Sequence, residues 1–286
     1  MHHTTANPPE GGRHRLILFR IARAVFPEQK ISNPRGSVTG KQEIVFELCA
    51  ESVEACVAGE AGGADRIELC TALVEDGLTP SHGLVRVALE RCNLPIHILV
   101  RPRAGDFVYS EAEFVTMKED IAHFKQMGVA GFVIGVLHAD GTVDRERTRE
   151  LVELAAPFEV TFHRAFDVTP SLEQALEDVI AIGCKRVLTS AGAPDVVTGA
   201  PMLATLVEQA AGRTEIALGG GLRIEDAEWL VRVTKARHYH GSLRQSEPAP
   251  VLAVGDEGME AVASRRGRSI VNPKDVQTMV AKLRNS

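Results

Sequence analysis

This 286-residue sequence has few aromatic side chains, no excess of positive charge and no long apolar runs. Aromatic residues make up 5% of the chain, which disfavours a stacking platform for single-stranded nucleic acid. The formal net charge is −6 and no basic stripe with interleaved aromatics occurs, so we expect no nucleic-acid partner. No apolar run reaches the roughly 18 residues of a membrane-spanning helix, so we expect no membrane partner.

Cysteine is also scarce, and its spacing is irregular. The five cysteines are an odd number and form no CxxC motif, so they do not make a disulfide framework. This pattern favours a reducing compartment, and we expect a cytoplasmic protein. Three cysteines fall inside a predicted helix or before a predicted strand, and we interpret them as structural: Cys56, Cys92 and Cys184.

The two ends of the chain differ in composition from its centre. Residues 1–41 are rich in Arg and poor in acidic residues, which is typical of a transit peptide or of a disordered extension. We expect a disordered or leader extension here. A disordered extension, or sequence upstream of the true start, is favoured over a transit peptide, because Ser is infrequent and no small-residue cleavage site is clear. Residues 244–286 contain several Pro and Gly before a weak helical pattern, and we expect a partly ordered tail there. Residues 42–243 remain as one domain.

Within this domain, apolar β-rich runs alternate with amphipathic helical segments. Eight such runs separated by helices predict a TIM-type (β/α)8 barrel of the α/β class. An open doubly wound sheet is the alternative, but no GxGxxG follows the first strand, and we expect no organic cofactor. The predicted strands are Glu43–Cys49, Arg66–Cys70, Ile96–Arg101, Gly131–Val136, Val160–Phe166, Arg186–Thr189, Glu215–Leu218 and Arg237–His240.

The tripeptide Glu-Leu-Cys ends the first two predicted strands, as Glu47–Cys49 and as Glu68–Cys70. One helix-length segment lies between the copies, so the two strands should be parallel neighbours. Because side chains alternate along a strand, both carboxylates and both thiols should point into the barrel at one rim. Soft thiolates at Cys49 and Cys70 would select Cu(I). The alternative, which the spacing alone favours, is that both cysteines pack as small buried hydrophobes.

Further charged side chains fall at the predicted strand ends or in the loops that follow. Arg101 and Arg103 can hold an organic anion bidentately, and His163 can serve as general acid or base with help from Glu47 or Glu68. The alternative is a structural salt-bridge network that fills the top of the barrel. The candidate catalytic set is Glu47, Glu68, Arg101, Arg103, Asp106, His163 and Asp167.

Glycines follow the last two predicted strands. In TIM barrels the loops after strands seven and eight often bind phosphate, because glycines let backbone N–H groups approach the anion. The alternative is a tight turn without a ligand, and the acidic residues Glu225 and Asp226 at the next helix count against a phosphate there. The candidate anion-binding set is Gly219, Gly220, Gly221, Gly241 and Ser242.

Longer motifs at the same strand ends carry a resemblance to a known family. They follow in order after the second Glu-Leu-Cys: Gly77–Ser81 (GLTPS), Val100–Phe107 (VRPRAGDF), Val160–Asp167 (VTFHRAFD) and the triple glycine. Over roughly Phe46 to Ser242, the chain resembles the CutC family of copper homeostasis proteins. Asp76 departs from the family pattern, in which a second Gly precedes GLTPS.

The resemblance implies a TIM-type barrel, a cytoplasmic homo-oligomer and Cu(I) binding through the positions of Cys49 and Cys70. It implies no defined reaction. Two functional hypotheses therefore stand side by side. The first is a copper-handling protein that binds Cu(I) at the barrel mouth. The second is an enzyme of unknown reaction that acts on a small anionic metabolite, such as a phosphate ester.

Overall fold

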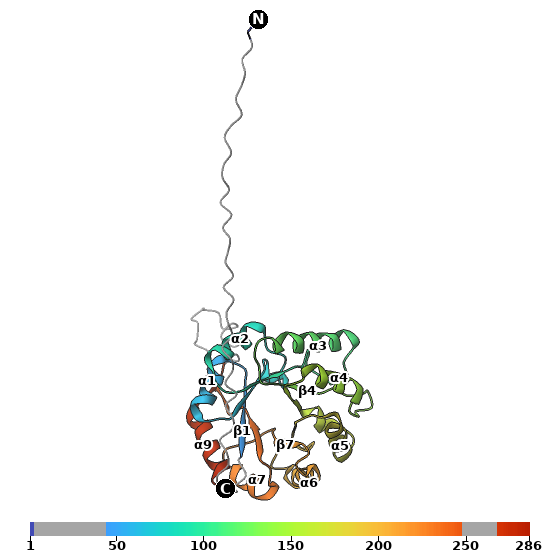
Figure 1. The fold of residues 1–286 in the computed structure, drawn as a ribbon. Helices are drawn as coiled ribbons and strands as arrows, with labels where there is room; N and C mark the ends of the chain where they lie inside the picture. Colours follow the sequence, from blue (N-terminus) through green and yellow to red (C-terminus); the bar gives the residue numbers. More distant parts are fainter. Residues whose placement is uncertain (3–43, 248–267) are drawn as a thin grey trace, which may run out of the picture. The chain divides into compact units, whose positions relative to one another are not determined.

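The computed structural model describes residues 1–2, 44–247 and 268–286 of the chain. Its eight parallel strands follow one another around a closed barrel, in which β1 pairs with β8. The predicted TIM-type barrel is confirmed, and Figure 1 shows the helices arranged around the strands. Apart from residues 1–2, the predicted leader lies outside the described residues. The strands are β1 (Val45–Ala50), β2 (Arg66–Leu69), β3 (Ile96–Leu99), β4 (Gly131–Ile134), β5 (Glu159–Phe162), β6 (Arg186–Thr189), β7 (Glu215–Leu218) and β8 (His238–Gly241).

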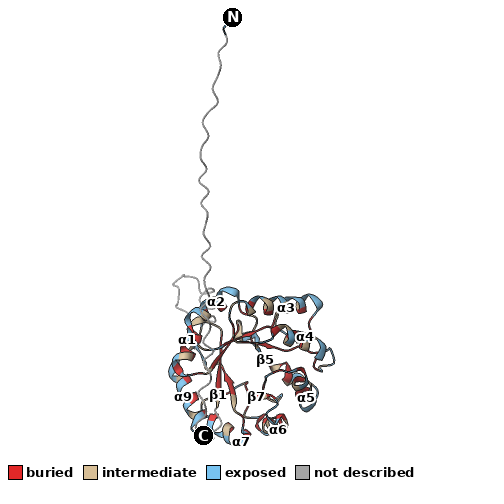
Figure 2. Cartoon of the chain, in the orientation of Figure 1, coloured by how far each residue is buried: buried red, intermediate tan, exposed pale blue. Residues whose placement is uncertain are grey.

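Helices cover the outside of the barrel, with buried faces towards the strands and exposed faces outwards (Figure 2). Several begin at a side chain that accepts an N–H of the first turn, and Ser110 with Glu113 forms a capping box. No helix of the described residues is long and apolar enough to cross a membrane. The helices are α1 (Val53–Gly62), α2 (His82–Arg91), α3 (Glu111–Lys125), α4 (Arg145–Ala155), α5 (Leu172–Ile182), α6 (Ala200–Ala210), α7 (Ala227–Thr234) and α9 (Pro273–Arg284).

Several strands end earlier than the sequence predicts. β3 ends at Leu99 instead of Arg101, and β5 ends at Phe162 instead of Phe166. After β5 the chain forms the 3-10 helix η2 (Arg164–Val168), because His163 Nδ1 accepts the N–H of Ala165 at 3.1 Å and caps the turn. The inward and outward alternation of side chains therefore stops at these strand ends.

Charged side chains are buried inside the barrel, and each cation is paired. Arg66 Nε donates to Glu47 Oε2 in a short hydrogen bond. Arg186 donates to Thr161 Oγ1 at 2.9 Å and to Glu159 Oε2 at 3.0 Å. Buried cations need such partners, because desolvation of an unpaired charge is costly. This polar interior holds the side chains of the mouth in fixed positions.

Apolar residues form two separate clusters. The larger one lies between strands and helices and contains big side chains such as Phe46, Phe132 and Phe162. The smaller one consists of Cys49, Cys70, Leu99 and Val133, all buried. These four residues alternate with the outward-facing ones along β1 to β4, so both cysteines face the barrel interior, as predicted from the alternation.

The segment after residue 243, expected to be a partly ordered tail, contains regular elements among its described residues. A short antiparallel pair, β9 (Arg244–Glu247) and β10 (Arg268–Val271), precedes α9. Helix α9 packs beside α1 and α7 and completes the outer ring (Figure 1). Its apolar stripe is spaced as an amphipathic helix requires and is buried: Val276, Met279, Val280 and Leu283.

Candidate functional site

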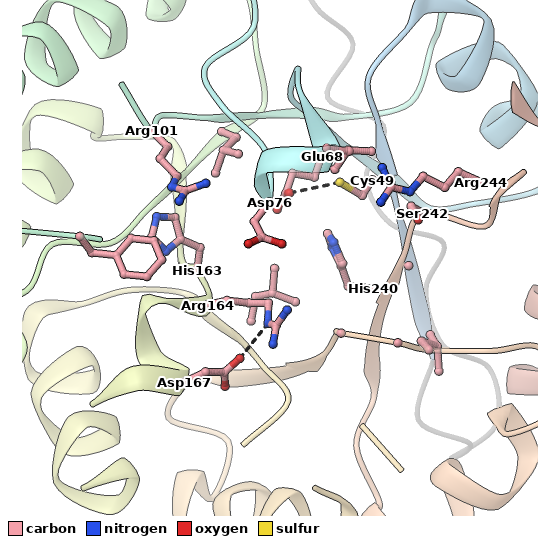
Figure 3. Close-up of a pocket in the computed structure, with 18 of the residues that line it drawn as sticks. Cys49, Glu68, Asp76, Arg101, His163, Arg164, Asp167, His240, Ser242 and Arg244 are labelled. Carbon is pink, nitrogen blue, oxygen red and sulfur yellow. Dashed lines mark hydrogen bonds and ion pairs between the residues drawn. The ribbon is translucent and has the colours of Figure 1, made fainter. Parts of the chain in front are cut away.

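A cavity of about 430 Å³ opens at the C-terminal ends of the strands, where parallel barrels place their chemistry. Figure 3 shows side chains from β1, β2, β8 and the loops converging on it. Nine of the predicted site residues line it: Cys49, Glu68, Arg101, His163, Asp167, Gly220, Gly221, Gly241 and Ser242. Five others do not: Glu47, Cys70, Arg103, Asp106 and Gly219.

The two cysteines of the Glu-Leu-Cys repeats lie in direct contact. Their Sγ atoms are 3.7 Å apart, and both side chains are buried. Cys49 lies opposite Glu68 in the β1–β2 pairing and donates to its Oε1 at 3.5 Å. The hydrogen bond with Cys70, followed by burial, raises the pKa of Cys49 well above its ordinary value. In the metal-free protein Cys49 is therefore a thiol.

His240 on β8 joins this pair from the other side of β1. Its Nδ1 donates to Glu47 Oε1 at 2.8 Å, because a carboxylate can only accept. Burial alone would raise the pKa of Glu47, but Arg66 and His240 lower it well below its usual range. Ligand atoms of Cys49, Glu68 and His240 all lie within 4.8 Å of one another. These three residues form the candidate metal cluster of the described chain.

His163 presents a hydrogen-bond donor from the opposite wall. Its Nδ1 accepts the Ala165 N–H, so Nε2 carries the proton, and Nε2 is buried without a partner among the described residues. Burial, with a smaller contribution from Arg101, lowers the pKa of His163 to about 3. The ring lies directly against Gly135, where a Cβ would come within 2.4 Å of His163 Cε1. His163 is therefore a neutral donor in a fixed orientation.

The two arginines after β3 separate, so the predicted Arg101–Arg103 clamp does not form. Arg101 lines the cavity and donates to three backbone carbonyls, which leaves its buried Nε without a partner among the described residues. Arg103 lies outside the cavity and pairs with Glu113 at 2.6 Å and Asp106 at 2.8 Å. The prediction continued the strand alternation past Leu99, where β3 has already ended.

Asp167 organises the loops of the mouth. It accepts hydrogen bonds from the Thr189 hydroxyl, the backbone N–H groups of Ser190 and Gly192, and Arg164 Nε at 2.8 Å. With its carboxylate occupied in this way, Asp167 holds other groups in position. The Arg164 side chain remains 42% exposed and points into the cavity in Figure 3.

The glycine loop after β7 passes close to Arg164. Gly220 and Gly221 have φ of 111° and 67°, which favour glycine. A Cβ on Gly220 would lie 3.1 Å from Arg164 Cζ, so the backbone can approach the guanidinium only without a side chain. Gly219 faces Leu188, where a Cβ would come within 2.4 Å of Leu188 Cδ1. Its absence from the cavity wall follows from this packing.

The sequence model of the CutC family matches residues 44–245, which is most of the chain. This chain belongs to the CutC family. It is 46% identical over 200 residues to a family protein CutC of Chromobacterium violaceum, covering 70% of this chain and 81% of the relative. It is 39% identical over 213 residues to a Homo sapiens copper homeostasis protein cutC homolog, covering 74% and 78%. A CutC crystal structure from Streptococcus agalactiae superposes with a TM-score of 0.67 at 29% identity, covering 70% and 98%.

Four charged or titratable cavity residues of this CutC-family chain were absent from the predicted catalytic, anion-binding and metal sets: Asp76, Arg164, His240 and Arg244. His240 could have been found from the alternation along β8, because it pairs with Glu47 when β1 closes the barrel on β8. Asp76 occupies the left-handed region, with φ of 62°, at the position where the family pattern has Gly. Arg244 carried no signal, since it follows the last barrel strand and lies in the segment expected to be a tail.

Proposed function

We propose that this CutC-family protein binds Cu(I) at the barrel mouth through Cys49 and Cys70. The observation that carries the proposal is the 3.7 Å separation of the two buried sulfur atoms. Thiolates are soft ligands that select Cu(I) over hard cations, and two sulfurs suit a metal of low coordination number. Zn²⁺ prefers four tetrahedral ligands, so a site built on two sulfur atoms suits it less well than it suits Cu(I).

His240 is the best third ligand. Its Nδ1 is held by Glu47, so Nε2 is the nitrogen that remains for a metal. A carboxylate behind a metal-binding imidazole is a common arrangement, because it fixes the tautomer and the ring orientation. Cu(I) would displace the thiol protons of Cys49 and Cys70 and, with His240 as third ligand, the proton on His240 Nε2. Glu68 Oε1 already accepts from the Cys49 thiol. All five cysteines carry free thiols, which fits the cytoplasmic location and reduced state expected from the sequence.

A competition titration with a chromogenic Cu(I) chelator, under anaerobic reducing conditions, tests the proposal. Cys49→Ser and Cys70→Ser each remove a proposed ligand. Each should weaken Cu(I) binding by more than about 10- to 100-fold, which is the loss that follows when a residue that only orients a metal ligand is replaced. Cys184→Ser is the matched control, because Cys184 is equally buried but belongs to the outer core. Unchanged affinity in the Cys49→Ser, Cys70→Ser double variant would refute copper binding at this pair.

A second candidate function, an enzyme acting on a small anion, is favoured by a different observation. Three buried polar atoms of cavity residues have no partner among the described residues: Glu68 Oε2, Arg101 Nε and His163 Nε2. Each unpaired buried group costs about 1–3 kcal/mol, so three around one cavity indicate a ligand that satisfies them. The homo-oligomer implied by the family stays a prediction.

A further inference from the structure

The cavity has two chemically different ends. One end carries positive charge and backbone donors, from Arg164 and the glycine loop at Gly220 and Gly221. The backbone N–H groups of these two glycines donate to no protein acceptor within the described part of the chain. Elsewhere on the wall, the neutral donor His163 Nε2 lies beside Arg101 and faces the buried carboxyl of Glu68, and neither His163 Nε2 nor Glu68 Oε2 has a partner among the described residues.

Charge at the first end is only partly neutralised. Asp167 occupies Arg164 Nε and Ser190 occupies Arg164 Nη2, which leaves Nη1 for a ligand. Glu225 and Asp226, the acidic residues near the start of α7, do not line the cavity, so they do not compete there. The remaining opposing charge is Asp76, whose carboxylate points towards the middle of the cavity in Figure 3. The Arg164 end therefore offers an anionic group one open guanidinium nitrogen and two backbone N–H groups.

We infer that the cavity binds a small organic oxyanion that carries a hydroxyl or carbonyl oxygen at its other end. This inference rests on the second candidate function and names its substrate class. The phosphate or carboxylate group would contact Arg164 and the glycine loop, while the neutral oxygen would accept from His163 Nε2. Glu68 would contact the same end of the ligand as a hydrogen-bond partner or proton acceptor.

The dimensions of the cavity limit the size of this ligand. About 430 Å³ falls at the small end of the roughly 300–1,000 Å³ that ligand pockets span. Leu73, Leu99 and Leu188 add apolar surface to the polar wall. A short carbon chain with an oxyanion at one end matches this distribution, whereas a dinucleotide or a peptide does not.

Calorimetric titration of metal-free protein tests the inference with three probes: glycerol 3-phosphate, malate and uncharged glycerol. We expect saturable binding of at least one anion with a Kd of about 1 mM or tighter, and no binding of glycerol. Tighter binding of glycerol 3-phosphate assigns a phosphate ester, and tighter binding of malate assigns a carboxylate. Weak or absent binding of both anions overturns the inference.

Variants then locate the site. Arg164→Gln and His163→Phe should each weaken anion binding by about 10-fold or more, since each removes a donor to the ligand. Arg103→Gln is the matched control, because its guanidinium is paired outside the cavity. Full affinity in Arg164→Gln, or an equal loss in Arg103→Gln, would contradict the assigned site. Cu(I) titration of Arg164→Gln should be unchanged, so failure of this inference and failure of the copper proposal are distinguishable.

Discussion

The buried ion pair beneath the mouth gives the sharpest test of how the site is held together. Glu47 is fully buried, and both of its carboxylate oxygens are used: one accepts from Arg66 and the other from His240. Glu47→Gln keeps the size of the side chain but removes its charge. Arg66 then stays buried near a second cation, Arg186, without its main counter-ion.

Removing one partner of a buried pair costs about 3–5 kcal/mol, because the remaining charge is desolvated and uncompensated. The matched surface pair is Glu177 with Arg213, whose two hydrogen bonds of 2.7 and 2.8 Å are as short but whose side chains are 41% and 46% exposed. Glu177→Gln should change the free energy of unfolding far less, because solvent screens the pair. Urea denaturation followed by circular dichroism measures both free energies of unfolding. If the two variants lose the same stability, the argument from burial is refuted.

Three further predictions concern the barrel. Burial lowers the pKa of His97 to about 3, so below about pH 6.5 His97 binds a proton in the unfolded chain but stays neutral in the folded one. The free energy of unfolding should therefore be about 2 kcal/mol lower at pH 5 than at pH 7 because of this residue. In urea denaturation, His97→Asn should lack this contribution. Gly135→Ala should displace the His163 ring, lower the thermal midpoint of unfolding and weaken anion binding in calorimetry. Gly83→Ala is the control, because a Cβ there would have no neighbouring atom nearer than 4.0 Å, and it should stabilise α2 by up to about 1 kcal/mol. Met279→Ala should cost about 2–5 kcal/mol in urea denaturation if α9 belongs to the core, and a loss below about 1 kcal/mol would contradict that assignment.

The strand pattern was enough to predict the barrel and the contact between Cys49 and Cys70, because alternation along a strand is a local property. It failed at Arg103, where β3 had ended and the chain direction is set by hydrogen bonds with Asp106 and Glu113. It indicated the helix of α9 but not its packing against α1 and α7, which joins distant parts of the chain. The partnership of Glu47 with His240 depends on barrel closure, which joins residues 193 positions apart.

The two proposals use opposite walls of one cavity and meet at Glu68. Its Oε1 accepts the Cys49 thiol, while its Oε2 has no partner among the described residues. A metal that replaces the Cys49 proton would change the hydrogen bonds and charge around Glu68, and an organic ligand at Oε2 would do the same from the other side. Because coupling between two binding sites is reciprocal, copper must alter anion affinity by the same factor by which the anion alters copper affinity. Under both proposals a single carboxyl group links copper binding to anion binding, and a change at Glu68 should affect both affinities.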